Sequence, residues 1–85
     1  MNVHRIYFSI DDPSTEHHIA WYLQGIDYTF YKAVGSWEGI EEPSYVIETI
    51  DGDLEEVRDI AYILKTAFRQ SAVLVTTHQV EAEML

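Results

Sequence analysis

The stretch from Gly35 to Ser44 carries the residue types in this chain that are best suited to chemistry. It places a tryptophan, two glycines and three carboxylates between two strand-like runs. Glycine permits positive φ and close approach of a ligand to the backbone. The flat π-face of Trp37 beside carboxylates is an arrangement that holds sulfonium or ammonium groups. We therefore predict that any small-molecule site lies against this stretch.

Within this stretch, Glu42 and then Glu41 are the candidate catalytic acids, because a carboxylate can take up a proton or fix an amine. An alternative stays open: an exposed hairpin loop with solvated acids, whose tryptophan covers a subunit contact. The pattern does not decide whether the chain is an enzyme. The residues expected to contact a ligand are Trp37, Gly35, Gly39, Ser44 and Tyr31.

Length and charge exclude several classes of function. The 85 residues are expected to form a single domain, 1–85, near the small end of what folds alone. Fifteen acids against five scattered bases give a net charge of −10, which argues against binding to nucleic acid or to an anionic membrane. DNA mimicry remains a minor alternative. The chain has no cysteine, which fits a reducing cytoplasm, and we expect neither a signal peptide nor a membrane span, because no apolar run approaches roughly 20 residues.

The histidines do not predict a metal site. His17 and His18 are adjacent on an expected helix and point about 100° apart, which is wrong for chelating one ion. The spacing of His4 and His78 is equally uninformative, so all four are expected to be ordinary surface residues. We predict no metal and no cofactor. A serine-nucleophile elbow and a phosphate-cradling glycine loop are also missing from the sequence.

The periodicity predicts a β-α-β-β-α-β order. Asp12 caps a first helix that starts at Pro13 and ends near Gly25, and Asp53 caps a second that runs to about Gln70. Their buried stripes are predicted to be Ile19, Tyr22, Leu23 and Ile26, and then Val57, Ile60, Ala61, Leu64 and Phe68. The expected strands are 3–10, 28–34, 45–50 and 72–77. This order is that of the ferredoxin-like α+β sandwich, with two helices on one face of a four-stranded antiparallel sheet.

The strands also predict self-association. Helices cover only one face of such a sheet, yet at least three of the expected strands are apolar at both parities. In one strand, Val46 and Ile50 alternate with Tyr45 and Ile47. In another, Val73 and Val75 alternate with Ala72 and Leu74. A sheet with two apolar faces is usually covered on the second face by another subunit. We therefore expect a homo-oligomer, most simply a trimer, with a dimer as the alternative.

Two motifs resemble a group of small phage-encoded proteins. The first is G-x-W-x-G-x-x-E-x-S, here Gly35, Trp37, Gly39, Glu42 and Ser44. The second is Q-x-A-V-L-V, here Gln70, Ala72, Val73, Leu74 and Val75. More distantly, the layout is similar to the bacteriophage S-adenosylmethionine hydrolases, now regarded as lyases. That resemblance implies a PII-like trimer of ferredoxin-like subunits in the cytoplasm of a bacterial host cell, with active sites between subunits. It also implies an acidic active-site residue, for which Glu42 is the match and Glu41 the next candidate. This chain is shorter than those enzymes.

Three functions follow as hypotheses. The first is a binding module, or a lyase, for a small cationic metabolite such as S-adenosylmethionine, with its site between subunits. The second is a non-catalytic phage accessory protein that binds a host protein through acids and aromatic residues. The third is a dimeric module of the monooxygenase or muconolactone-isomerase kind, whose pocket lies between helices and sheet, where His4 is the obvious candidate.

Overall fold

A computed structural model describes residues 1–85, apart from the side chain of Trp37. Its strands pair in the order β2–β3–β1–β4, and each neighbouring pair is antiparallel. This is the predicted ferredoxin-like arrangement, with β1 between β3 and β4. The elements are β1 (Asn2–Phe8), the short 3-10 helix η1 (Pro13–Thr15), α1 (His18–Tyr22), β2 (Thr29–Trp37), β3 (Ile40–Ile50), α2 (Leu54–Ala67) and β4 (Leu74–Gln79).

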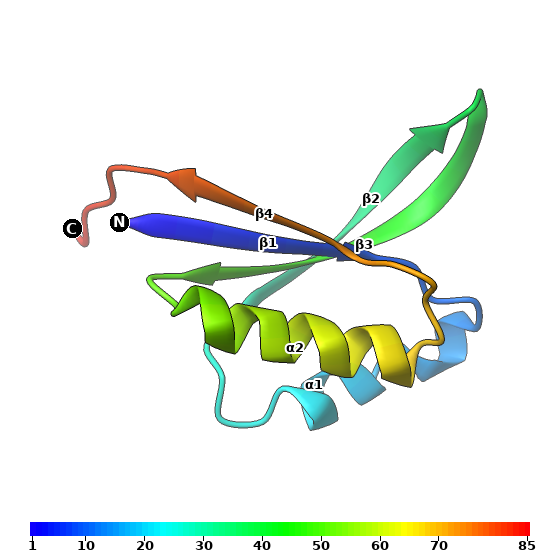
Figure 1. Cartoon of the computed structure of the whole chain (residues 1–85), viewed down its shortest axis with the longest axis horizontal. Helices are drawn as coiled ribbons and strands as arrows, with labels where there is room; N and C mark the ends of the chain where they lie inside the picture. The colour runs from blue at the N-terminus through cyan, green and yellow to red at the C-terminus, as the bar shows by residue number, and fades with distance from the viewer.

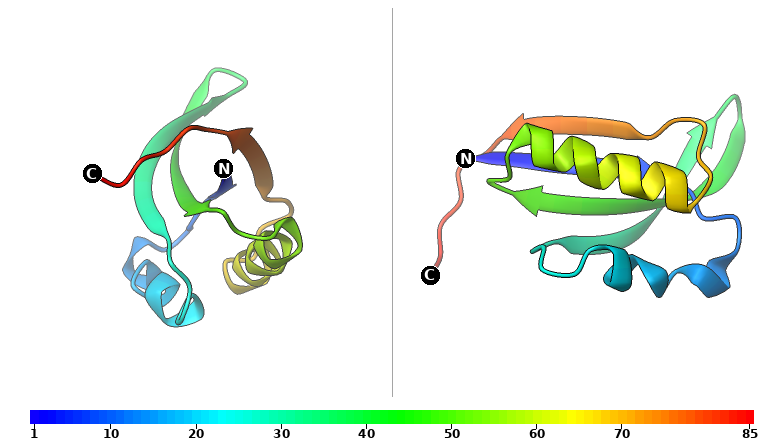
Figure 2. Two further views of the ribbon diagram at one scale, coloured as in Figure 1. Left: turned by 90° about the vertical axis from the view of Figure 1, so that its left-hand side faces the viewer. Right: turned by 60° about the horizontal axis from the view of Figure 1, so that its bottom comes forward.

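Both helices lie on one face of the sheet and leave the other face uncovered (Figures 1 and 2). The core fills the space between the helices and the sheet. Alternate residues of β1 and β3 point into it and meet in register, with Ile6 opposite Ile47 and Phe8 opposite Tyr45. The stripes of both helices supply the other half: Ile19, Leu23, Val57, Ile60, Ala61, Leu64 and Phe68 are all buried.

Helix α2 begins where the sequence predicts. The carboxylate of Asp53 accepts a hydrogen bond from the backbone N–H of Glu55 at 3.0 Å, which satisfies one of the free donors of the first turn. The helix ends at Ala67, slightly earlier than expected. The backbone turns there because Arg69 adopts a positive φ of 53°.

The first helix is much shorter than predicted. Only Pro13–Thr15 and His18–Tyr22 are helical, and the first of these is a 3-10 turn. Asp12 caps as expected, but the hydroxyl of Thr15 also donates to the Asp12 carbonyl oxygen at 2.7 Å. Such local side-chain bonds compete with a regular α-helical ladder. The predicted stripe still faces the core, since Ile19 and Leu23 are buried and Tyr22 and Ile26 pack against them.

The second and third strands are longer than predicted, and this changes the character of the Gly35–Ser44 stretch. The two strands continue their pairing through Gly35 opposite Glu42 and Trp37 opposite Ile40, so most of the expected loop is β-structure. Pro43 is tolerated there because the pairing of β3 with β1 ends at Tyr45, which leaves the other edge of β3 free of ladder bonds.

One histidine does not lie on the surface. His4 is only 2% exposed and faces the helices. Its Nε2 donates to the Gly52 carbonyl oxygen at 2.8 Å, and its Nδ1 lies 2.9 Å from the Thr77 hydroxyl. His4 therefore fixes the turn after β3 to both β1 and β4. The sequence placed His4 on the correct strand parity, but the prediction of an ordinary surface residue was wrong.

No helix in the described part of the chain combines the length and the apolar character needed to cross a membrane.

Candidate functional site

The Gly35–Ser44 stretch forms a projecting arm, the paired ends of β2 and β3 with their turn. Figure 1 shows this hairpin curving away from the rest of the sheet. A two-residue turn closes it, in which Glu38 and Gly39 have positive φ of 50° and 78°, as in a type I′ turn. Val34 and Ile40 on the arm are 72% and 62% exposed. The arm therefore presents apolar side chains to its surroundings.

Two adjoining hollows lie at the base of the arm, where β1 ends and α2 connects to β4. The first, of about 500 Å³, runs along Glu42 and Pro43 and has Arg69 and Asp11 on its other walls. The second, of about 680 Å³, runs along Ser44 and extends to Tyr7 and Leu74. Ser9, Gln70 and Ser71 line both hollows, so the two adjoin each other, and together they form a region open to solvent. We call it the arm-base hollow.

Gln70 ties together the chain segments around this hollow. Its side-chain Oε1 accepts a hydrogen bond from the Ser9 backbone N–H at 3.0 Å, and its Nε2 donates to the Phe68 carbonyl oxygen at 3.0 Å. One side chain thus holds the end of β1 against the end of α2. This contact gives a physical reason for the glutamine of the Q-x-A-V-L-V motif.

The structure separates the predicted site residues into groups. Glu42 and Ser44 line the arm-base hollow. Glu41 is exposed on β3 opposite Ser36, and it lines neither hollow. Gly39 uses its freedom in the turn, whereas Gly35 has no positive φ and pairs with Glu42 within the ladder. The predicted ligand contact of Trp37 falls on a side chain outside the described residues. The roles of all these residues in a site stay predictions.

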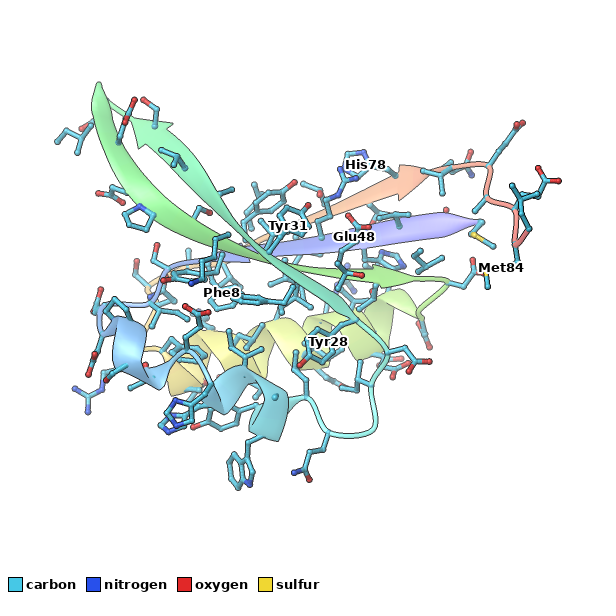
Figure 3. All side chains as sticks on the ribbon, turned by 180° about the vertical axis from the view of Figure 1, so that it is seen from behind. Phe8, Tyr28, Tyr31, Glu48, His78 and Met84 are labelled. Carbon is cyan, nitrogen blue, oxygen red and sulfur yellow. The ribbon has the colours of Figure 1, made fainter. Side chains whose placement is uncertain are left out.

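Tyr31 lies elsewhere, on the sheet face that the helices leave uncovered, which we call the open face. Figure 3 shows Tyr31 and His78 on that side and Phe8 and Tyr28 on the helix side. Strand register places one row of side chains across all four strands, from Tyr31 through Val46 and Tyr7 to Leu74. Val46 is buried, but Leu74 is 59% exposed and Tyr31 37%. The open face of this chain thus exposes apolar surface, as the strand parity predicts.

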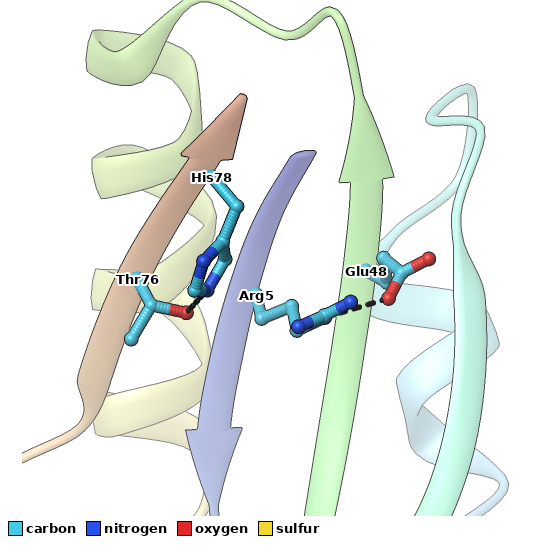
Figure 4. Close-up of polar contacts among 4 residues, drawn as sticks. All are labelled: Arg5, Glu48, Thr76 and His78. Carbon is cyan, nitrogen blue, oxygen red and sulfur yellow. Dashed lines mark hydrogen bonds and ion pairs between the residues drawn. The ribbon is translucent and has the colours of Figure 1, made fainter. Parts of the chain in front are cut away.

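The next row of the open face is polar. It runs from Thr29 through Glu48 and Arg5 to Thr76. Arg5 Nε donates to Glu48 Oε2 at 2.8 Å, and the two side chains are 34% and 23% exposed. Figure 4 shows this ion pair beside a second contact, in which His78 Nε2 lies 3.1 Å from the Thr76 hydroxyl. The hydrogen bond with Glu48 raises the pKa of Arg5 above its ordinary value.

The pKa of Tyr31 gives a test of this surface. Burial raises it above the ordinary value near 10, the charge of Arg5 opposes the rise and the charge of Glu48 adds to it. A raised pKa means that the folded chain favours the neutral phenol. The stabilisation from this phenol is therefore complete below the unfolded pKa and is lost as the pH rises through the folded pKa.

We expect the tyrosinate absorbance that Tyr31→Phe removes to develop at a higher pH than that of the unfolded chain. Glu48→Gln should lower the Tyr31 pKa, because it removes a negative charge and leaves Arg5 unpaired. A Tyr31 that titrates at the same pH in the folded wild type and in the unfolded chain would contradict the placement of these three side chains.

Sequence reasoning missed Arg5, Glu48 and Arg69. The strand alternation does put Arg5 opposite the parity of Ile6, but only the register of β1 and β3 brings it against Glu48. The signal for Arg69 is an arginine where a helix end usually has glycine. Among the described residues, no three His, Cys, Asp or Glu side chains gather closely enough to hold a metal ion.

Comparison with solved structures bears out the resemblance predicted from the sequence. A phage SAM lyase in its apo state matches with a TM-score of 0.71 and 24% identity, over 91% of this chain and 78% of that one. A divalent cation tolerance protein CutA1 from Thermus thermophilus matches with 0.55 and 8%, over 99% and 88%. The PII-like protein CutA from Nostoc sp. PCC 7120 matches with 0.50 and 8%, over 95% and 82%.

These identities establish the fold alone. The chain has the ferredoxin-like, PII-like fold, as predicted. No protein-family model matches the chain, and no curated protein matches it by sequence.

Proposed function

We propose that this chain binds a small cationic or zwitterionic metabolite in the arm-base hollow. A second copy of the chain covers the open face and closes the site. The bound ligand, S-adenosylmethionine or a similar compound, then undergoes a lyase reaction. One observation carries the proposal. Glu42 and Ser44, selected from their types and spacing, line two adjoining hollows on a chain whose fold is similar to that of a phage SAM lyase.

The geometry of the hollow favours Glu42 as the first acid of the site. Glu42 stands among walls from several segments of the chain, whereas Glu41 lines no hollow in the single chain. In an assembly, a neighbouring copy that approaches the arm meets Glu41 as well, and Glu41 is the second acid of the proposal. A cationic ligand compensates the desolvation of a carboxylate that a second copy covers.

The exposed apolar side chains support coverage by a second copy. On the open face Tyr31, Ile50 and Leu74 remain accessible around the Arg5–Glu48 ion pair, and the arm adds Val34 and Ile40. Exposed apolar side chains on a sheet face that no helix covers are typical of protein interfaces. We expect a trimer, with a solution mass three times the 9.9 kDa of one chain. A dimer, at twice the mass of one chain, is the alternative.

The proposed reaction needs positioning and exclusion of water. A carboxylate oxygen of the methionine part attacks the γ-carbon of the same methionine chain, which is bonded to the sulfonium sulfur. The carbon–sulfur bond breaks, and its electron pair neutralises the sulfur. The products are a five-membered lactone and a neutral thioether nucleoside. Glu42 would hold the ammonium group, which orients the chain of the ligand for this attack.

The test is a thermal-shift and mass-spectrometry experiment with S-adenosylmethionine. Ligand at 100 times its dissociation constant should stabilise the folded chain by about 2.7 kcal/mol. Glu42→Gln should remove this stabilisation and the formation of lactone while leaving the melting temperature without ligand unchanged. Glu38→Gln is the matched control, because it makes the same change on the same arm at a turn residue that lines neither hollow. A wild-type chain that neither binds S-adenosylmethionine nor converts it would exclude this function.

A second candidate function is that of a non-catalytic accessory protein that binds a host protein. The exposure of Val34 and Ile40 on a projecting arm favours it, since interface cores concentrate apolar residues. It predicts a dimer or trimer, at twice or three times the 9.9 kDa of one chain, that no metabolite in a broad panel stabilises.

A further inference from the structure

Arg69 occupies a backbone position that is unfavourable for its side chain. The Arg69 N–H donates to the Thr66 carbonyl oxygen at 3.3 Å, and the Gln70 N–H donates to that of Lys65 at 2.8 Å. These two bonds form a Schellman motif, in which the residue at the position of Arg69 usually is glycine. Arg69 has a φ of 53°, in the left-handed region where a Cβ costs energy. A glycine would serve the helix end better, so local structure does not explain the arginine.

Arg69 lines the arm-base hollow together with two acidic residues. Glu42 contributes one carboxylate from the arm, and Asp11 contributes the other from the connection after β1. Within the described part of the chain Arg69 has no ion-pair partner, whereas Arg5 pairs with Glu48 and Lys32 with Glu16. In a chain with fifteen acids, a guanidinium thus shares a hollow with carboxylates without pairing with them.

The segment that carries Arg69 is held in place. The side chain of Gln70, the next residue, accepts from Ser9 N–H and donates to the Phe68 carbonyl oxygen. The first bond joins Gln70 to the residue that follows β1, and the second joins Gln70 to the residue before Arg69. The backbone on both sides of Arg69 is therefore held, which fixes the direction of its Cα–Cβ bond and lowers the ordering cost of binding.

We propose that Arg69 binds the carboxylate of an α-amino-acid group while Glu42 binds its ammonium, so that the arm-base hollow selects ligands with a zwitterionic amino-acid end. This rests on the proposed function and specifies the substrate class of that site. A guanidinium matches a carboxylate in bidentate geometry, and a carboxylate accepts two N–H donors from an ammonium. The separation of opposite charges across one hollow suits a ligand that carries both charges on one carbon.

The experiment compares Arg69→Gly with the wild type, using S-adenosylmethionine, S-adenosylmethionine that lacks its carboxylate, and methionine as probes in calorimetric titrations. We expect Arg69→Gly to bind S-adenosylmethionine and methionine at least tenfold more weakly and to bind the carboxylate-free compound as tightly as the wild type does. Its melting temperature should rise by about 4–8 °C, since the strain at Arg69 is relieved. That rise shows that weaker binding does not come from unfolding. Arg58→Ala, which removes the same charge from an exposed position of α2 away from both hollows, should bind all three probes like the wild type.

The outcomes separate this inference from the proposed function. Equal affinity of wild type and Arg69→Gly for S-adenosylmethionine would overturn the inference and leave the proposed function standing. Binding of methionine but not of S-adenosylmethionine, with loss in Arg69→Gly, would support the inference and overturn the proposed substrate. A parallel loss of the carboxylate-free compound in Arg69→Gly would assign Arg69 a general effect on the hollow and overturn its role as carboxylate ligand. A wild type that binds none of the three probes would overturn both.

Discussion

Leu64→Ala is expected to lower the free energy of unfolding by about 2–5 kcal/mol, the range for truncation of fully buried leucines. Leu64 is 0% exposed and lies in the middle of the α2 stripe, packed between the helix and the sheet. The cost combines the lost transfer of its methyl groups from water with the cavity left behind. It is a large fraction of the roughly 5–15 kcal/mol that stabilises a typical small protein. Urea denaturation of both proteins measures it.

Ile63→Ala is the matched control. Ile63 precedes Leu64 on the same helix, is 41% exposed and loses a side chain of the same size. We expect it to cost roughly 1 kcal/mol or less, because its side chain remains partly in water in the folded state. A loss below about 0.5 kcal/mol for Leu64→Ala would mean that α2 presents a different face to the sheet.

Lysine substitutions at two neighbouring positions of β4 are expected to have opposite consequences. Val75 pairs with Ile6 and packs against the core from the helix side of the sheet. Val75 is partly buried, so Val75→Lys brings an ammonium against apolar side chains or displaces the strand, and should cost roughly 1–3 kcal/mol. We expect a lower melting temperature, measured by circular dichroism.

Leu74→Lys places the same charge on the open face, where Leu74 is 59% exposed. The subunit should keep its fold, with a change in unfolding free energy within about 0.5 kcal/mol for the isolated chain. If a second copy covers this face, sedimentation should show a shift to the 9.9 kDa monomer. A Leu74→Lys chain that still sediments as an oligomer would locate the interface away from this part of the open face.

The sequence predicted the elements whose signals are local. The Asp53 cap and the buried stripe of α2 lie within one helix, and both are present in the structure. The strand alternation of β1 also assigned Ile6 and Phe8 to one face. Helix α1 was predicted too long because apolar periodicity does not register competing hydroxyl bonds, such as that of Thr15.

The long β2–β3 arm could not be predicted in the same way. Glycines and a proline normally mark a loop, and Gly35, Gly39 and Pro43 all lie in this stretch. The pairing of Gly35 with Glu42 follows from the register set farther down the hairpin, where Phe30 meets Ile47 inside the core. The tertiary packing of those residues therefore extends the ladder over residues that taken alone favour a turn.

In the candidate site, too, some residues follow from local sequence signals and others only from contacts between distant segments. Residue type and spacing predicted Glu42 and Ser44 as site residues; both line hollows at the base of the arm, and their role in a site stays a prediction. Type and spacing did not identify Arg69, which is distant in sequence and lines the same hollow as Glu42 only in the folded chain, where Gln70 joins the end of α2 to the end of β1. The Arg5–Glu48 pair likewise depends on the register between β1 and β3, two strands that are far apart in the chain.

By itself the sequence determined the order of the elements and the faces of α2 and β1, because periodicity and caps act over a few neighbouring positions. Only the tertiary structure decided the length of the arm, the burial of His4 and the hollow that brings Glu42, Asp11 and Arg69 together. Those features depend on strand register and on packing between distant segments, which no local pattern specifies.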